Sequence, residues 1–394
     1  MVKEQKLNIL FLSSWYPNRV LPTNGNFVQK HAEAVALKSN VIVLFVCSDT
    51  SCKKTIEVTE QTINNVFTIL VYYKKEKNFI PVFSFVQKCV RYVRAYSKGF
   101  KIVRKYFKRI DLVHHNILFP TGIITLYLKY VKRIPYVVSE HWTGYLPASN
   151  SYKGALRKLI TKTIANNASY LIPVSEDLQT VMKNNGFKSN YAIVPNVVDV
   201  KLFYPRSTKS KNGKIKLVHI STLNDEQKNI SGMLRTIAKL SKQRTDFEMW
   251  FMGDGDTAPP IKKAMELGIY NSTVFFDGTK TTTEVADIMR NADCFVLFSN
   301  HENLPCVMIE ALASGIPIVA SAIGGIPEHI DSSSGILVKP GDEEELLNSL
   351  NKIFESIRAG KYGAQQLSSY AKANFSYEKV SEQFHVLYQK VLKN

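Results

Sequence analysis

The sequence predicts an α/β protein in which two Rossmann-like domains, each built on a doubly wound parallel sheet, face one another across a cleft. Three observations support this fold class. The chain has 394 residues, which is too long for one ordinary hydrophobic core and sufficient for two. Short, continuously apolar runs alternate with helical patterns, as expected for buried parallel strands joined by helices. The alternation also begins again after a polar segment in the middle of the chain.

The strands of the N-terminal half are expected where apolar residues follow one another without interruption. The first two runs, "LNILFL" and "VIVLFV", are rich in β-branched residues and suit strands that are buried on both faces. In chain order the expected strands are Leu7–Leu12, Val41–Val46, Ile110–Val113, Tyr136–Ser139, Tyr170–Val174 and Ala192–Val194. Helical spacing of apolar residues between these runs predicts helices, among them Phe27–Leu37 and Ser175–Asn184.

The link between the domains is expected in the segment Pro195–Lys214, which is polar, contains prolines and ends in basic residues. We place the boundary between residues 1–200 and residues 201–375. Beyond it, strands are expected at Lys216–Ile220, Glu248–Met252, Thr273–Phe276, Cys294–Phe298 and Pro317–Ala320. Helices are expected at Asn229–Ser241, Ile261–Leu267, Thr283–Arg290, Leu304–Ala313, Glu343–Ser356, Ala364–Ala373 and Tyr377–Leu392.

Composition narrows the class of protein further. The net charge of +18 favours an anionic partner, which could be a nucleic acid, a nucleotide or an acidic lipid surface. No apolar run is long enough to span a membrane and no secretion signal is evident, so we expect a cytoplasmic protein. The five Cys residues are scattered without metal-ligand spacing, which predicts reduced thiols.

The segment "HENLPCVMIEALASG" (301–315) carries two carboxylates eight positions apart, Glu302 before the predicted helix and Glu310 within it. A helix start offers free N–H groups and a partial positive charge, which bind phosphate well. Helical side chains tilt toward the N-terminus, so both acids can flank a bound phosphate and accept hydrogen bonds from sugar hydroxyls. A ligand with a sugar at each end of a diphosphate would fit. The alternative is an ordinary helix with an exposed Glu302 and a salt-bridged Glu310.

Three further motifs follow one another along the chain. They are "IVPNVVDVKLFYP" (193–205), the strand-ending turn "FMGDGD" (251–256) and a long stretch from "VFFDGT" to "GGIPE" (274–328) that contains both acids. In this order they resemble glycosyltransferase family 4, the retaining sugar transferases of the GT-B fold. The resemblance implies an acceptor-binding domain over 1–200, a nucleotide-sugar-binding domain over 201–375 and a last helix, 376–394, that packs back on the first domain.

The resemblance also implies the donor-binding residues. Glu310 would bind the ribose hydroxyls, and Glu302 would contact the donor sugar. Asn303 and Leu304 would give backbone N–H groups to the phosphates, and Gly253 belongs to the Gly-Asp-Gly turn of the donor site.

Four more positions correspond to family positions with a known role, and at one of them the residue differs from the family's. Lys228 matches a Lys that grips the diphosphate, but Thr222 stands where the family usually has its companion Arg. His141, after a predicted strand, would lie near the transferred sugar; the alternative is a structural hydrogen-bonding His. Gly25 matches the Gly-rich turn before the first helix, although such a Gly can serve the turn alone.

The function implied is a hexosyltransferase-like enzyme (EC 2.4) that moves a sugar from a UDP- or GDP-linked donor to a glycan or lipid-linked acceptor, with retention. It would act in cell-surface polysaccharide or glycolipid synthesis and would need no metal or cofactor. The missing Arg leaves open an inactive, nucleotide-sugar-binding partner subunit. A dehydrogenase is disfavoured because no Gly-x-Gly-x-x-Gly joins a strand to a helix.

The stretch Phe79–Arg109 is basic and aromatic. Its part 87–109 contains nine Lys and Arg and no acid, and apolar residues such as Val90, Val93 and Phe100 recur at helical spacing. A basic amphipathic helix of this kind suits an anionic membrane surface, so we expect peripheral binding at the inner face of the cell membrane. The alternative is a core-packed helix with a solvated basic face. Nucleic-acid binding is disfavoured because no motif for it occurs.

Overall fold

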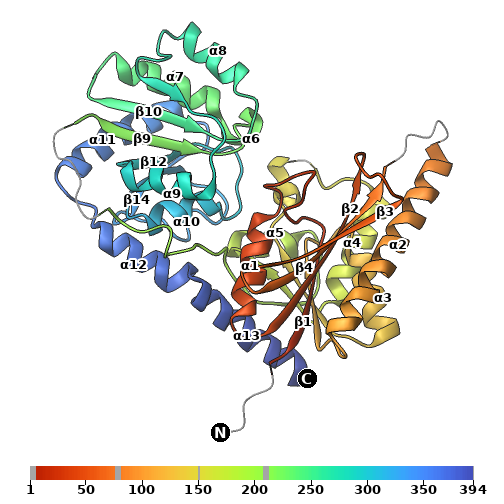
Figure 1. Ribbon diagram of the computed structural model, residues 1–394. Helices are drawn as coiled ribbons and strands as arrows, with labels where there is room; N and C mark the ends of the chain where they lie inside the picture. The colour runs from red at the N-terminus through yellow and green to blue at the C-terminus, as the bar shows by residue number, and fades with distance from the viewer. Residues whose placement is uncertain (1–5, 76–80, 150, 207–212, 394) are drawn as a thin grey trace.

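The computed structural model describes residues 6–75, 81–149, 151–206 and 213–393, with the backbone alone at 81–85 and 148. These residues form two α/β domains, each with helices against both faces of a twisted sheet (Figure 1). The predicted fold class is therefore confirmed. Continuous apolar runs became the central strands, because a parallel strand between two helical layers is buried on both faces.

The N-terminal sheet has eight strands among the described residues, in the order β3-β4-β2-β1-β5-β6-β7-β8. Neighbouring strands are parallel except in the β3–β4 hairpin at the edge. The strands are β1 Asn8–Ser13, β2 Asn40–Asp49, β3 Ile56–Ile63, β4 Val66–Lys74, β5 Leu112–Asn116, β6 Tyr136–Glu140, β7 Tyr170–Pro173 and β8 Asn190–Tyr191. The helices are α1 Asn26–Ala36, α2 Pro81–Tyr106, α3 Gly122–Lys132, α4 Ala155–Asn167 and α5 Glu176–Asn184.

Some of these elements were not predicted. The hairpin β3–β4 and the helices α3 and α4 were missed, and β8 lies at 190–191 instead of Ala192–Val194. The pair Asn64-Asn65 in the sequence could have indicated the hairpin, because Asn is common in tight hairpin turns. Both residues adopt positive φ at this turn.

The C-terminal sheet has six strands within residues 213–393, all parallel, in the order β11-β10-β9-β12-β13-β14. The strands are β9 Ile215–Ile220, β10 Phe247–Met252, β11 Val274–Phe276, β12 Cys294–Leu297, β13 Ile318–Ser321 and β14 Gly335–Val338. The helices are α6 Asp225–Lys228, α7 Ile230–Ser241, α8 Ala258–Glu266, α9 Thr282–Asn291, α10 Cys306–Ala313, α11 Glu343–Arg358, α12 Ala364–Phe375 and α13 Tyr377–Lys393. All but β14 and the short α6 match a predicted element.

The chain passes between the domains near Val198 and again near Ser376, and these two segments lie side by side. The Val198 N–H donates to the carbonyl oxygen of Phe375 at 2.9 Å, and Val198 pairs in parallel with Ser376. Helix α13 then packs against α1 and places Phe384 and Tyr388 in the N-terminal core.

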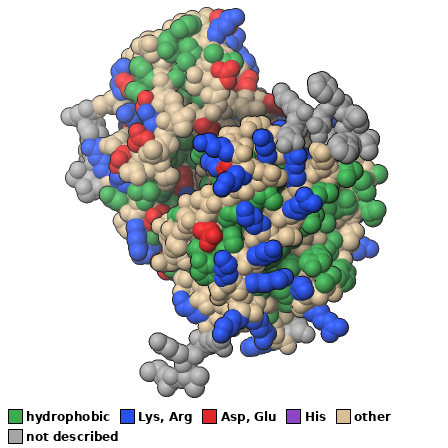
Figure 2. Space-filling view, turned by 45° about the vertical axis from the view of Figure 1, so that its right-hand side comes forward, with side chains coloured by type: hydrophobic (Ala, Val, Ile, Leu, Met, Phe, Trp, Pro, Cys, Tyr) green, Lys and Arg blue, Asp and Glu red, His purple; other side chains and the backbone are tan. Residues whose placement is uncertain are grey.

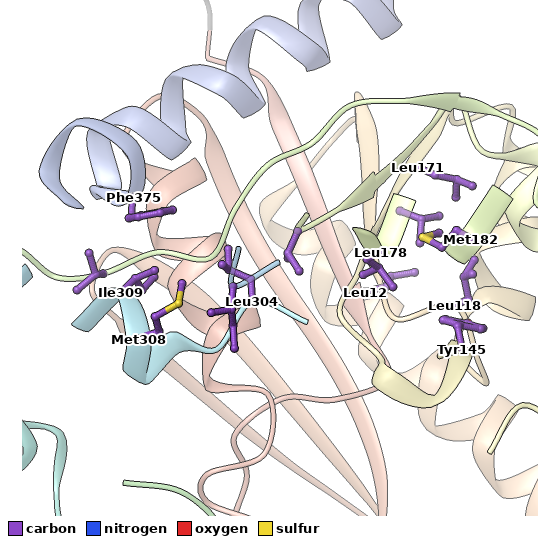
Figure 3. Packing of buried hydrophobic residues seen from close by; sticks show 14 of the residues in the cluster. Leu12, Leu118, Tyr145, Leu171, Leu178, Met182, Leu304, Met308, Ile309 and Phe375 are labelled. Atoms are coloured by element: carbon purple, nitrogen blue, oxygen red, sulfur yellow. The ribbon is translucent and has the colours of Figure 1, made fainter. Parts of the chain in front are cut away.

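One buried apolar cluster continues from domain to domain. It includes Leu12 and Leu178 in the N-terminal domain, Leu304 in the loop before α10 and Met308 in the first turn of that helix. Figure 3 shows these side chains along the boundary, with Leu304 on the side that faces the N-terminal domain. The two domains therefore share apolar packing around the segment that carries the paired acids.

Candidate active site

Helix α10 starts later than the sequence predicts. It runs over Cys306–Ala313, with Pro305 as its extended N-cap, instead of beginning at Leu304. Proline keeps the residue before it out of the helical region, so residues 302–304 belong to the loop between β12 and α10. The two acids are therefore held differently: Glu302 by the loop and Glu310 by the body of the helix.

Glu302 is buried and paired. Its Oε1 lies 2.5 Å from the Nζ of Lys228 and accepts a 2.8 Å hydrogen bond from the Ser299 hydroxyl. Lys228 ends α6, a single turn that the Asn224 side chain caps by accepting from the Gln227 N–H. Glu302 and Lys228, both predicted from the sequence, thus meet directly. The expectation that Glu302 on an ordinary helix would be exposed does not describe this structure.

Glu310 is also buried, and its partner comes from the other domain. The Nζ of Lys30, in α1, lies 2.9 Å from Glu310 Oε1. Burial alone would lower the pKa of Lys30, but the negative charge of Glu310 and its hydrogen bond to the ammonium group, with a further contribution from Glu33, outweigh burial and raise that pKa. Lys30 was not predicted as a site residue. Its role could not be inferred from the sequence, because Lys30 and Glu310 are 280 positions apart.

The Gly324-Gly325 pair, expected to permit close approach of the backbone, lies against the acid loop itself. At Gly324, φ is +55°, and a Cβ there would come within 2.2 Å of the Glu302 carbonyl oxygen. The Gly325 N–H donates to the Asn303 carbonyl oxygen at 2.8 Å. The loop after β13 therefore holds the backbone of Glu302 and Asn303 in place.

His141 lies directly after β6 and contacts the acid loop. Its carbonyl oxygen accepts a 2.7 Å hydrogen bond from the Asn303 side chain. The turn that carries it is held by the buried Glu140 carboxylate, which accepts from the N–H groups of His141 and Trp142 at 2.9 and 3.0 Å. The structure therefore brings His141 and Asn303 together at the boundary, from opposite domains.

The imidazole of His141 packs at 4.4 Å between ring centroids on Phe27 and at 5.2 Å on His31. Within the described residues neither ring nitrogen makes a well-aligned hydrogen bond, although the Asn196 amide lies beside the ring. Burial, with the nearby His31 and His114, lowers the pKa of His141 well below its ordinary value. The ring is thus neutral and carries one donor and one acceptor nitrogen, both of them buried in this structure.

Gly25 is the N-cap of α1 and has a left-handed backbone with φ +75°. A Cβ at this position would lie 2.6 Å from the carbonyl carbon of Trp15, so only glycine allows the loop after β1 to pass so closely. This turn aims the first turns of α1, with Lys30 and His31, at the boundary with the other domain.

Thr222 and Gly253 lie together at the ends of β9 and β10, beside a pocket of 570 Å³. A Cβ on Gly253 would come within 1.6 Å of the Ser221 carbonyl oxygen, and one on Gly255 within 1.8 Å of that of Thr222. The pocket is lined by three carboxylates, Asp225, Asp254 and Asp256, and by no Lys or Arg of the described chain. Thr222 therefore has no cation beside it in that pocket.

The structure brings Glu302, Asn303, Leu304, Glu310, Lys228 and His141 to one boundary, with Gly25 in the loop that leads to Lys30. Leu304 is held there by the Asn196 amide, which donates to its carbonyl oxygen at 2.7 Å. Thr222 and Gly253 lie beside this group, next to the pocket at the ends of β9 and β10. The N-terminal domain contacts the same region, where the Thr23 hydroxyl donates a 3.0 Å hydrogen bond to the Asp254 carboxylate. Sequence reasoning missed Lys30, Ser299 and Asn196.

Comparison with known families agrees with this arrangement. Residues 214–356 match the family described as glycosyl transferases group 1, and residues 35–202 match glycosyltransferase family 4. The two matches together span most of both domains, including every predicted site residue except Gly25.

Two curated relatives are similar over a large part of the chain. The MMP α-(1→4)-mannosyltransferase of Mycolicibacterium hassiacum is 25% identical over 74% of this chain and 67% of its own length. The α-monoglucosyldiacylglycerol synthase of Streptococcus pneumoniae is 24% identical over 61% of this chain and 58% of its own.

Two solved structures share the fold over nearly the whole chain. The sucrose-phosphate synthase of Thermosynechococcus elongatus superposes with a TM-score of 0.77 at 19% identity, over 98% of this chain and 99% of its own. Anabaena HepE, in complex with UDP and glucose, gives a TM-score of 0.73 at 18% identity, over 97% and 99% of the two chains. The chain belongs to glycosyltransferase family 4, has the GT-B fold, and is an enzyme of the glycosyltransferase class (EC 2.4).

Proposed function

We propose that this protein transfers a sugar from a nucleoside-diphosphate sugar to a hydroxyl group of a glycan or lipid-linked acceptor, with retention of anomeric configuration. The observation that carries the proposal is the arrangement around the N-terminus of α10. Two buried acids, each paired with a lysine, flank a helix start that faces the opposite domain. Acids suit sugar hydroxyls, while lysines and a helix N-terminus suit phosphates.

In the proposed reaction the bond between the anomeric carbon and the β-phosphate oxygen breaks, and a bond to the acceptor oxygen forms on the same face. The acceptor proton passes to the leaving phosphate. Lys228 and the N-terminus of α10 stabilise the negative charge that develops on the diphosphate. His141 and Glu302 orient the transferred sugar, and Glu310 holds the ribose. The proposed reaction assigns no step to a metal ion, so a chelator should leave turnover unchanged.

The donor is proposed to be UDP- or GDP-linked. HepE, which shares the fold, was solved with UDP and glucose, which makes UDP-sugars the first candidates. The related S. pneumoniae enzyme is named as a synthase of glucosyldiacylglycerol, which supports a lipid-linked acceptor. Placement in cell-surface polysaccharide or glycolipid synthesis follows from this comparison and from the surface of the N-terminal domain described next.

That surface is formed by α2, α3 and α4, three helices without a single Asp or Glu. The C-terminal half of α2 packs on the core through Tyr96 and Val103, while Val90 and Val93 in its first half are 43% and 54% exposed. Further exposed apolar side chains come from the neighbouring helices: Ile123, Tyr127, Tyr130, Val131, Leu156 and Leu159. Of the stretch Phe79–Arg109, Phe79 and Ile80 lie outside the described residues, as do the side chains of 81–85.

Figure 2 shows basic and hydrophobic side chains intermixed over the N-terminal domain, on the lower right. Arg94, Lys98 and Lys101 on α2 are exposed. Apolar side chains among cations suit the headgroup region of an anionic membrane, so we propose peripheral binding through α2–α4 at the cytoplasmic face. No helix in the described part of the chain has the length and apolar character to span a bilayer.

A thermal-shift screen of UDP-, GDP- and ADP-sugars tests the donor, followed by NMR of the anomeric proton in the product to test retention. The alternative is an inactive, nucleotide-sugar-binding subunit. Both forms would show a thermal shift, but only the enzyme would release nucleoside diphosphate above the level of a Glu302→Gln control when acceptor-containing membranes are added. Absence of any nucleotide-sugar binding would refute both.

A further inference from the structure

A diphosphate site needs positive charge, and the C-terminal domain offers little of it. Lys228 is the lysine expected there, and it is already paired with Glu302 at 2.5 Å. The place of the family's Arg is taken by Thr222, whose pocket is lined by carboxylates and no described cation. Two phosphates carry more negative charge than one paired lysine and one helix N-terminus can balance.

Lys30 lies where a second cation would be needed. It extends from α1 across the boundary to α10, and its side chain is only 15% exposed. Its Nζ contacts Glu310 on the second turn of α10, on the same helix face as Cys306, the first residue of that helix. The ammonium group is therefore beside the helix start that the proposed function assigns to the phosphates.

The pairing of Lys30 also has a cost for the donor. Glu310 cannot give its full hydrogen-bonding capacity to a ribose while Oε1 is occupied by Lys30. Glu310 is buried and Lys30 is largely shielded from solvent, so leaving either charge without a partner would be costly. Donor binding would give each group a new partner: the Lys30 ammonium group would move to a phosphate oxygen, and the Glu310 carboxylate would accept hydrogen bonds from the ribose hydroxyls.

We propose that Lys30 is the second cation of the diphosphate site, delivered by the N-terminal domain in place of the family's Arg. This inference rests on the proposed function. Lys30 is held by Glu310 in the nucleotide-free protein and is passed to the diphosphate when the donor binds. Since Lys30 and Lys228 belong to different domains, the diphosphate would bridge them and bind tightly only when the cleft is closed.

The test compares diphosphate affinity with nucleoside affinity by isothermal titration calorimetry, with UDP against uridine, GDP against guanosine and ADP against adenosine. Lys30→Gln should lower the ratio of nucleoside-diphosphate to nucleoside affinity roughly 10- to 100-fold, the range for hydrogen bonds between charged groups. Lys30→Arg should retain the ratio within about threefold, because it keeps the charge. Lys38→Gln, just beyond α1 and paired with Glu382 on the surface, is the matched control and should change nothing.

An unchanged ratio in Lys30→Gln, or an equal loss for nucleoside and nucleoside diphosphate, overturns the role of Lys30. If the single variant does not fold, Lys30→Gln with Glu310→Gln removes the pair as a unit and is compared with Glu310→Gln alone; the same drop in ratio is expected. Failure of the proposed function is a different result: the wild-type protein would then bind none of the three nucleoside diphosphates.

Discussion

The ammonium group of Lys228 and the carboxylate of Glu302 lie 2.5 Å apart in a buried pair that joins the loop before α10 to the end of α6. Removing one partner leaves the other charge uncompensated, which typically costs about 3 to 5 kcal/mol of folding free energy. Removing both charges at once avoids that cost. This pair therefore allows stability and catalysis to be separated.

We expect Glu302→Gln to lower kcat by at least about 100-fold, because the carboxylate that orients the transferred sugar is lost. Adding Lys228→Met should restore most of the free energy of unfolding without restoring turnover. Urea denaturation and a nucleoside-diphosphate release assay measure the two effects. Recovery of turnover in the double variant would mean that the pair is only structural.

Glu310→Gln should weaken recognition of the ribose. The wild-type protein is expected to bind UDP or GDP more tightly than the 2′-deoxy form, because a carboxylate accepts strongly from a hydroxyl. The variant should bind ribo and deoxy forms within about threefold of one another. Full discrimination by Glu310→Gln in competition titrations would place the ribose elsewhere.

The His141 ring can be tested apart from its packing. His141→Phe retains contact with Phe27 but lacks both nitrogens, while His141→Ala lacks both properties. If a ring nitrogen binds the transferred sugar, both variants should lose kcat by roughly 100-fold or more with an unchanged Tm in the Phe variant. Near-normal turnover in His141→Phe would assign the residue to packing alone.

Acid should destabilise the fold through buried neutral histidines. Burial lowers the pKa of both His31 and His115 to about 4, against an ordinary value near 6.5. Between these values the unfolded chain binds protons that the folded protein does not, so the free energy of unfolding falls as pH drops from 6.5 to 4. His115→Phe should make this dependence shallower in urea titrations at pH 7 and pH 5. An equally steep dependence would show that His115 does not contribute.

Charge reversal on α2 tests the membrane surface. Arg94→Glu, Lys98→Glu and Lys101→Glu together should reduce binding to anionic vesicles by at least roughly 100-fold, since each cation near such a surface contributes about 1 kcal/mol. The matched control reverses Lys242, Lys262 and Lys352, which are exposed on the C-terminal domain and change the net charge equally. Similar losses in both variants, measured by co-sedimentation, would indicate a general charge effect instead of an anchor.

The sequence predicted the strands of the core well because their continuous apolar character follows from burial on both faces. It also named the residues at the start of α10, since Glu302, Asn303 and Glu310 lie within one short segment. Lys30 could not be found in this way. Its partner is 280 positions distant, and the contact depends on how the two domains are placed.

The edge hairpin was missed for a different physical reason. Strand β3, Ile56–Ile63, carries Glu, Thr and Gln on a largely exposed face, so its pattern is that of a surface segment. Burial along helix α2 could not be predicted either. The apolar face of this helix packs on the core in its second half but is exposed to solvent in its first half. Periodicity identifies a helix, but it does not reveal what covers its apolar face.

The return of α13 to the first domain bears on how the protein is made. Val380, Phe384, Leu387, Tyr388 and Val391 complete a core whose strands are synthesised at the beginning of the chain. During translation the surface of the N-terminal domain that α13 covers therefore stays exposed until the second domain has been synthesised. The second domain can fold as it is synthesised, whereas the core of the first domain is complete only after α13 has been made.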